Sequence, residues 1–106
     1  MNKTRIRSNK IREAAKGQNC QISVPGICNH DPLTVVAAHS GRNTDGASMG
    51  QKSDDLFVAF ACNKCHDFVD GRIHSKHFNN DREWFFNRGM RRTQRLLFNA
   101  GIIVIK

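Results

Sequence analysis

The sequence predicts a small α+β domain in which two strands and a helix form a ββα core. A helix is expected on each side of this core, and a zinc ion is expected to stabilise it. Three observations predict this fold: two strand-like runs in the middle of the chain, a C-terminal segment with helical spacing, and two pairs of cysteines. The 106 residues have the length of one domain, so we expect a single domain over residues 1–106.

The N-terminal region is predicted to contain one short helix. Residues 1–8 are basic and are expected to be mobile, whereas residues 9–16 can form a helix. Ser8 is suited to be its N-cap and Gly17 to stop it. A helix of this length needs tertiary contacts to persist.

A tight loop is expected to follow this helix and to join the first two cysteines. Residues 20–24 alternate like a strand, and Pro25-Gly26 is a turn signal. The chain then returns through Ile27, which brings Cys20 and Cys28 together at the ends of the loop.

The predicted core spans residues 33–71. A β-rich run over 33–39 ends in a histidine and is followed by a polar, glycine-rich loop over 40–53. A second strand-like run over 56–61 leads into a short helix over 63–69, which Gly71 is expected to stop.

The C-terminal third is predicted to be a basic helix over residues 81–100 with Asp81 as its N-cap. Its apolar positions, which follow helical spacing, are Phe86, Met90, Thr93 and Leu97. Trp84 and Phe85 are also expected in the core. Residues 102–105 are expected to form a closing strand, which is too short to span a membrane.

Four arginines are predicted to face away from the core on this helix and to bind nucleic-acid phosphates. They are Arg88, Arg91, Arg92 and Arg95, and Lys52 in the preceding loop is predicted to join them. The alternative is a solvated helix face without a ligand.

The distribution of charge also indicates a polyanionic partner. The chain has a net charge of +8 and a pI near 10.0. Residues 1–16 hold six Lys/Arg against one acid and residues 72–95 hold seven against two, whereas residues 17–71 are net acidic. Basic flanks around an acidic centre suit a protein that grips DNA at its edges and holds a divalent cation in its middle.

The cysteines are predicted to hold one structural zinc ion. Cys20 and Cys28 have seven residues between them, and Cys62 and Cys65 have the two-residue spacing typical of structural zinc. The sequence Cys-x-x-Cys-His also matches a haem-attachment pattern, but haem would leave two cysteines without a role. Because residues 1–17 do not resemble a secretory signal, we expect a reducing compartment, no haem and no disulfide.

The order of strand, loop, strand and helix resembles the HNH, or ββα-metal (His-Me finger), nucleases. The resemblance covers residues 33–71 and rests on His39 after the first strand and on Cys62-Asn63-Lys64-Cys65-His66 at the start of the helix. It implies an HNH-like nuclease domain with His39 and His66 in the active site.

Nearly the whole chain resembles a narrower family. The runs 11–29, 38–39 and 61–70 are similar to the YbcO-like family of phage and prophage proteins, which are regarded as zinc-binding nucleases. The resemblance implies phage origin, nuclease activity and, in that case, the cytoplasm of a bacterial host.

Two histidines and one acid can supply the chemistry of phosphodiester hydrolysis. His39 is suited to be the general base, because an unperturbed imidazole titrates near pH ~6.5. His66 and Asp70 lie one helical turn apart and can hold Mg²⁺ or another divalent cation. The alternatives are ordinary roles: a hydrogen-bonded His39, a His66 that caps the zinc site, and an Asp70 paired with Arg72.

Two positions depart from the HNH pattern. Many HNH enzymes have a metal ligand before the base histidine, where this chain has Ala38. The nearest counterpart of the usual orienting Asn is Asp55, which we interpret as a candidate catalytic residue. The groups that can replace the missing ligand are Asp70, Asp67, His74 and His77.

The sequence therefore favours a metal-dependent endonuclease that hydrolyses DNA and carries a structural zinc. A second hypothesis is a zinc-stabilised DNA-binding module without catalysis. A third is an adaptor that binds phage recombination or replication proteins.

Overall fold

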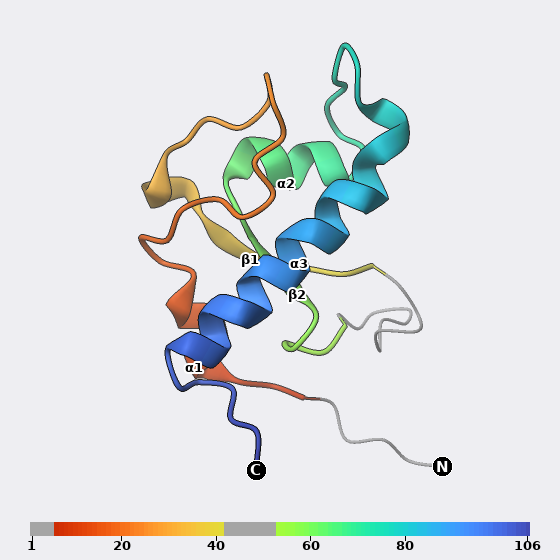
Figure 1. The fold of residues 1–106 in the computed structure, drawn as a ribbon. Coiled ribbons are helices and arrows are strands. Elements are labelled where there is room, and N and C mark those ends of the chain that lie inside the picture. The colour runs from red at the N-terminus through yellow and green to blue at the C-terminus, as the bar shows by residue number, and fades with distance from the viewer. Residues whose placement is uncertain (1–5, 42–52) are drawn as a thin grey trace, which may run out of the picture.

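The sheet at the centre of the fold consists of two short antiparallel strands. The computed structural model describes residues 6–41 and 53–106, and Figure 1 shows how their elements are arranged. In chain order these are α1 (Asn9–Ala14), the 3-10 turn η1 (Pro32–Thr34), β1 (Val36–His39), β2 (Val58–Ala61), α2 (Asn63–Val69), the 3-10 turn η3 (Asn79–Asp81) and α3 (Arg82–Asn99). The predicted small α+β domain is confirmed at this level.

The strand β2 is the most enclosed element of the fold. All four of its residues are buried, and Ala38 and His39 of β1 pair with Ala59 and Val58. On its other edge, the Phe60 amide donates to Thr93 Oγ1 (2.9 Å), and its carbonyl accepts from the backbone of the cysteine loop (2.7 Å). A helix side chain and a loop therefore cover the edge that a two-stranded sheet would leave open.

The helix α3 crosses the sheet and supplies much of the core (Figure 1). Phe86, Thr93 and Leu97 are buried as their spacing predicted, and Phe85 is buried beside them. Gly89 lets the helix approach closely, because a Cβ there would lie 2.7 Å from Ile22 Cγ1 and 3.2 Å from the Cβ of Ala59. In the described ranges, no helix is both long and apolar enough to cross a membrane.

Several predicted helix boundaries are confirmed. The Ser8 hydroxyl accepts a hydrogen bond from the Ile11 amide at the start of α1. Gly71 has a φ of +83° directly after the last turn of α2, as expected of a C-terminal stop. Asp81 occupies the N-cap position of α3, but its side chain makes no capping hydrogen bond there.

Four predictions for strands and core were wrong. Residues 20–24 and 102–105 are not strands, and the first strand begins at Val36 because residues 32–34 form a 3-10 turn. After Gly101, two successive amides donate to the Leu97 carbonyl at the end of α3, which leaves them unable to join a sheet. Trp84 is 54% exposed, because the face that α3 buries carries Phe85, Phe86, Thr93 and Leu97 instead.

The segment 6–8 was expected to be mobile, but it is hydrogen-bonded to the chain before β2. The Ile6 carbonyl accepts from the Asp55 amide (2.8 Å), and the Ser8 amide donates to Asp55 Oδ2 (2.7 Å). A buried carboxylate needs such donors, and this part of the N-terminal flank supplies them. The rest of the flank lies outside the described residues.

Candidate functional site

The four cysteines converge into one cluster between the 20–28 loop and α2. Their Sγ atoms all lie within 4.8 Å of one another, and those of Cys28 and Cys62 are 3.8 Å apart. Four sulfurs at about 2.3 Å from a tetrahedral zinc would be about 3.8 Å apart. The cluster could therefore hold a metal ion.

Backbone amides around this cluster point at the sulfur atoms. The amide of Ser23 donates to Cys20 Sγ (3.4 Å), that of Val24 to Cys65 Sγ (3.5 Å) and that of Cys65 to Cys62 Sγ (3.3 Å). Ser23 has a φ of +50°, the left-handed conformation that turns the chain around Cys20. These amides are used on sulfur, which explains why the predicted strand over residues 20–24 does not form.

The thiols do not share their protons equally. A hydrogen bond from Cys65, against the cost of burial, lowers the pKa of Cys20, and the same bond together with burial raises the pKa of Cys65. Burial also raises the pKa of Cys28 to about 11. Because a bound metal requires thiolates, metal binding at this cluster must release protons.

A second site joins β1 to the segment before β2. His39 Nε2 lies 2.7 Å from Asp55 Oδ1, and the Asp55 side chain is fully buried. The structure thus brings together the predicted base and the acid predicted to orient it. Among the described residues, no hydrogen bond engages the other ring nitrogen, Nδ1, which is therefore the candidate to contact a ligand or water.

The first turns of the chain surround the Asp55 carboxylate with donors. Arg12 Nη1 lies 3.0 Å from Oδ2 and Arg7 Nη1 lies 3.5 Å from Oδ1, beside the amide of Ser8. Burial raises the pKa of Asp55, but the hydrogen bonds from His39 and Ser8 and the charge of Arg12 outweigh it and lower the pKa. Asp55 is therefore a fixed negative charge beside the imidazole.

Sequence reasoning missed the two arginines that complete this site. Arg12 lies 43 residues from Asp55 in the chain, so no local pattern joins them. The available signal was weak: it consisted of Asp55, an acid before a buried strand, and of the basic N-terminal helix α1. The contact itself depends on how α1 packs beside β1.

The predicted ligand pair on α2 is also formed. His66 Nε2 lies 3.2 Å from Asp70 Oδ2, close to the spacing of about 3 Å between adjacent ligands of a small octahedral cation. Arg72 Nη2 contacts the same oxygen at 3.0 Å, as the alternative interpretation of Asp70 expected. A cation bound by this pair must therefore either displace Arg72 or share the Asp70 oxygen with it.

Apart from Asp70, the proposed replacements for the ligand absent at Ala38 do not gather around this pair. Asp67 pairs with Arg72, whereas His74 and His77 are exposed. Within ranges 6–41 and 53–106, the cysteines are the sole set of three or more donor groups close enough to share a metal ion. Ala38 itself is buried in the hydrophobic core.

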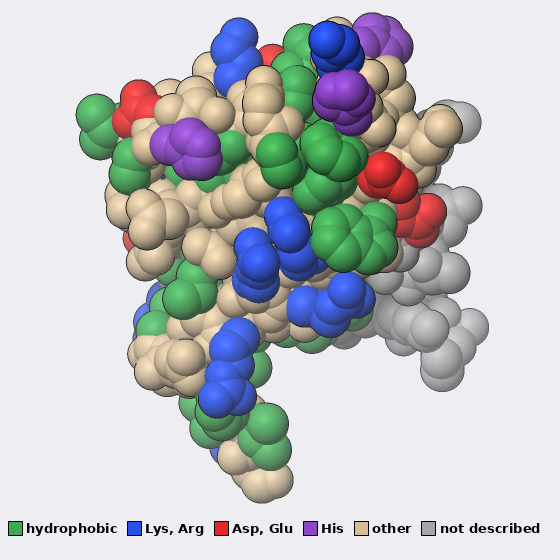
Figure 2. Space-filling view, turned by 45° about the horizontal axis from the view of Figure 1, so that its top comes forward, with side chains coloured by type: hydrophobic (Ala, Val, Ile, Leu, Met, Phe, Trp, Pro, Cys, Tyr) green, Lys and Arg blue, Asp and Glu red, His purple; other side chains and the backbone are tan. Residues whose placement is uncertain are grey.

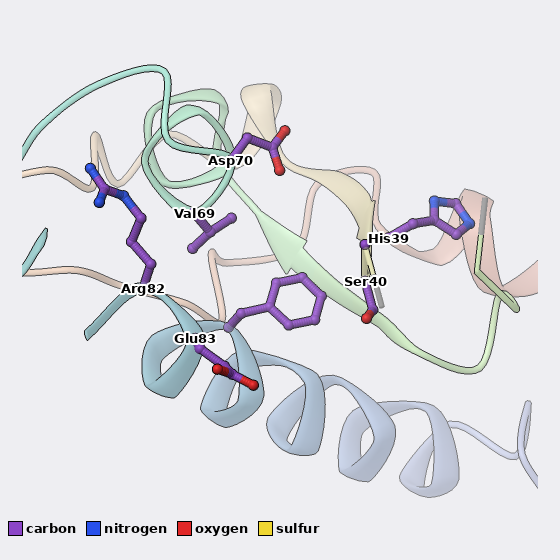
Figure 3. Close-up of a pocket in the computed structure, with 8 residues that line it drawn as sticks. His39, Ser40, Val69, Asp70, Arg82 and Glu83 are labelled. Atoms are coloured by element: carbon purple, nitrogen blue, oxygen red, sulfur yellow. The ribbon is translucent and has the colours of Figure 1, made fainter. Parts of the chain in front are cut away.

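A pocket of about 340 Å³ lies between the end of β1, the end of α2 and the start of α3. Its lining includes His39, Ser40, Asp70, Arg82 and Glu83. Figure 3 shows the imidazole of His39 turned away from Asp70, toward the side where Asp55 engages it. In the described part of the chain, no hydrogen bond or ion pair joins the His39–Asp55 pair to the His66–Asp70 pair.

The predicted phosphate-binding residues separate into two groups. Arg91, Arg92 and Arg95 are exposed on α3, and Figure 2 shows basic side chains gathered on the face along which this helix runs. Arg88 instead turns inward and donates to the Ile22 carbonyl (2.7 Å). Lys52 lies outside the described residues.

Comparison with known proteins places the chain in a family. A family model described as "Putative nuclease YbcO" matches residues 9–102. The chain belongs to the YbcO family. Two relatives with that description, one from Escherichia coli K12 and one from Enterobacteria phage 82, are each 40% identical over 93 residues. The match covers 88% of this chain and 95% of each relative.

A solved structure supports the same fold. It is described as a "putative bacteriophage protein" from Escherichia coli K-12, and it is 36% identical to this chain with a TM-score of 0.71. The match covers 87% of this chain and all of the solved one. The predicted membership of the YbcO family is thus confirmed, and the described fold is one that a relative also adopts.

Proposed function

We propose that this YbcO-family protein is a metal-dependent endonuclease that hydrolyses DNA phosphodiester bonds and carries a structural zinc. The observation that carries the proposal is the 2.7 Å hydrogen bond between His39 and the buried Asp55. A histidine held by a buried carboxylate is oriented to take a proton on its free nitrogen, and the carboxylate stabilises the imidazolium that results.

The steps at this site follow from its own side chains. His39 Nδ1 takes the proton of the attacking water, while Asp55 keeps the ring in one orientation. Arg12 and the amide of Ser8 fix the carboxylate in turn. A divalent cation held by His66 and Asp70 would supply the positive charge that phosphodiester hydrolysis needs near the phosphate and its leaving oxygen.

The order β1, β2, α2 supports an HNH-like version of this site, because His39 ends the first strand and His66 lies on the helix. Asp55 takes the orienting role that an Asn has in the HNH pattern. Substrate binding is assigned to the exposed arginines of α3, whose charges are not paired with acids on the same face.

The zinc proposal rests on the cysteine cluster. Four sulfur donors with a 3.8 Å edge leave no open position for a water, as in structural rather than catalytic zinc sites. We assign this cluster to folding and His66 with Asp70 to catalysis. Zinc content is measurable directly on the purified protein.

The decisive test is nicking of a supercoiled plasmid by zinc-loaded protein with Mg²⁺, Mn²⁺ or Ni²⁺. His39→Ala is expected to reduce nicking at least about 100-fold, the usual size of a general-base contribution. Asp70→Asn is also expected to reduce nicking, because it removes a ligand of the divalent cation. His74→Ala is the matched control, since this exposed histidine lies outside the site. Equal cutting by His39→Ala and the parent would exclude His39 as the base.

A non-catalytic DNA-binding module is the second candidate function, and two observations favour it. Ala38 offers no ligand, and Arg72 already contacts the Asp70 oxygen that a cation would use. If folded, zinc-loaded parent binds DNA but never cuts it with any of these ions, the binding module is the correct function. A protein that binds recombination proteins but no DNA at low salt would instead be the adaptor.

A further inference from the structure

Arg88 is the one predicted phosphate-binding arginine that α3 directs at the cysteine loop. Its Nη2 donates to the carbonyl of Ile22 at 2.7 Å and approaches that of Ser23 at 3.4 Å. Both carbonyls belong to the turn that wraps Cys20, where the Ser23 amide donates to the Cys20 sulfur. Arg88 thus holds the outer side of a turn whose inner side contacts a candidate metal ligand.

Within residues 6–41 and 53–106, which the structure describes, no ion pair joins Arg88 to a carboxylate. The rings of Trp84 and Phe85 lie 5.0 and 5.1 Å from its guanidinium carbon, and its Nε is buried without a hydrogen-bond partner among the described residues. Burial, followed by the charge of Arg92, lowers the pKa of Arg88, whereas negative charge on Cys20 and Cys65 acts in the opposite direction. An unpaired cation in such a place is costly unless an anionic group lies nearby.

The cysteine cluster can be that anionic group. Four thiolates around one divalent zinc ion carry a net charge of −2, which the protein must balance. Groups just outside a metal's ligands commonly orient those ligands and tune their charge. Among the described residues, Arg88 is a cation that donates to the turn around Cys20.

We propose that Arg88 is a positioning residue of the four-cysteine centre, which holds the Cys20–Ser23 turn and balances the charge of the metal-loaded thiolates. This inference rests on the proposed structural zinc. It separates Arg88 from its helical neighbour Arg92, which stays on the exposed DNA-facing side. The proposal also links zinc binding to DNA binding. Metal loading would fix α3, and with it the phosphate-binding arginines, against the cysteine loop.

The test measures zinc affinity by competition with a chromophoric chelator, and the thiolate-to-metal charge-transfer absorption of the Co²⁺-substituted protein. Arg88→Ala is expected to weaken zinc binding about 10- to 100-fold and to change the Co²⁺ spectrum. Arg88→Lys keeps the charge and Arg88→Gln keeps a donor, so charge balance predicts a smaller loss for Lys than for Gln. Arg92→Ala is the matched control and is expected to bind zinc as the parent does.

The outcomes distinguish this inference from the function on which it rests. A parent that binds no zinc would refute the proposed centre, and the role of Arg88 with it. A parent that binds zinc, with unchanged affinity in Arg88→Ala and a DNA-binding loss equal to that of Arg92→Ala, would make Arg88 a DNA contact only. If Arg88→Ala does not fold, the Lys and Gln variants decide, and equal zinc affinity in both and in the parent would overturn the proposal.

Discussion

At the scale of single residues, one buried carboxylate joins three parts of the chain. Asp55 engages His39 at the end of β1, Arg12 on α1 and the amide of Ser8, and these lie far from it in sequence. A carboxylate is fully buried at low cost only where donors surround it. The contacts that offset the cost of burying Asp55 therefore also orient the proposed base.

Asp55 is expected to give the protein a specific sensitivity to acid. Its pKa in the folded state lies below the usual 3.8, so its contribution to stability is complete above that pH and is lost as the pH falls through the lower, folded-state value. Asp55→Asn should lower the urea midpoint of unfolding near pH 6, and the difference from the parent should shrink below about pH 4.

This measurement compares urea midpoints between about pH 2 and 6, with circular dichroism as the readout. Metal content is measured at each pH, and midpoints are compared only where parent and variant hold the same amount of metal, so the difference between them isolates the carboxylate. Asp54→Asn is the control, because this neighbour is less buried and does not contact His39. A difference that stays constant across this pH range would contradict the assignment of a depressed pKa to Asp55.

Thr93 is expected to stabilise the fold through its hydroxyl rather than its methyl group. Its Oγ1 accepts from the buried Phe60 amide at 2.9 Å and donates to the Gly89 carbonyl at 2.7 Å. Thr93→Val keeps the shape but leaves the amide without a partner, which should cost about 1–3 kcal/mol of unfolding free energy. Thr93→Ser keeps the hydroxyl and should be the more stable of the two in urea titrations; the reverse order would assign the role to packing.

At the scale of elements, the sequence predicted the helices whose faces and ends are marked by nearby residues. α2 and α3 were predicted because apolar spacing, Gly71 and Asp81 mark their faces and ends within a few residues. The 20–28 loop looked like a strand because alternation does not reveal that its amides bind sulfur. The partners of Asp55 were only partly predictable, since His39 was suggested by a family pattern whereas Arg12 depends on tertiary packing.

Gly89 is expected to set the distance between α3, the sheet and the cysteine loop. Alanine favours helix by about 1 kcal/mol over glycine at an interior position. Here, however, its Cβ would lie 2.7 Å from Cγ1 of the fully buried Ile22 and 3.2 Å from Ala59, and such overpacking costs about 1–3 kcal/mol. We expect Gly89→Ala to lower the midpoint of urea unfolding, and Asn99→Ala at the exposed end of the helix to leave it nearly unchanged. A more stable Gly89→Ala would show that the loop shifts without penalty.

At the scale of the whole molecule, the cysteine cluster joins the loop of residues 20–28 to α2, with 33 residues between the two pairs of ligands. The sheet has two strands, and a domain of this size buries a smaller share of its surface than a large one. Structural zinc supplies on the order of 10 kcal/mol of apparent binding free energy, comparable to the whole stability of a small domain. The metal and the hydrophobic core are therefore expected to act as one folding unit.

Removal of the metal is expected to unfold the protein. Zinc-loaded protein treated with excess chelator should lose its helical circular dichroism signal or melt at a much lower temperature, and added Zn²⁺ should restore it. Because the ligands must be thiolates, the chelator should act faster and more completely as the pH falls. A melting temperature that does not change when demonstrated zinc is removed would show that the core suffices alone.

The exposed arginines of α3 are expected to make DNA binding depend steeply on salt. Each phosphate contact contributes about −0.9 to the slope of log K against log salt concentration on duplex DNA. Arg91→Ala, Arg92→Ala and Arg95→Ala should therefore each weaken binding and make the slope shallower by roughly one. Lys76→Ala removes the same charge from an exposed position outside α3 and serves as the control. If all four variants change the slope equally, net charge rather than the α3 face binds the DNA.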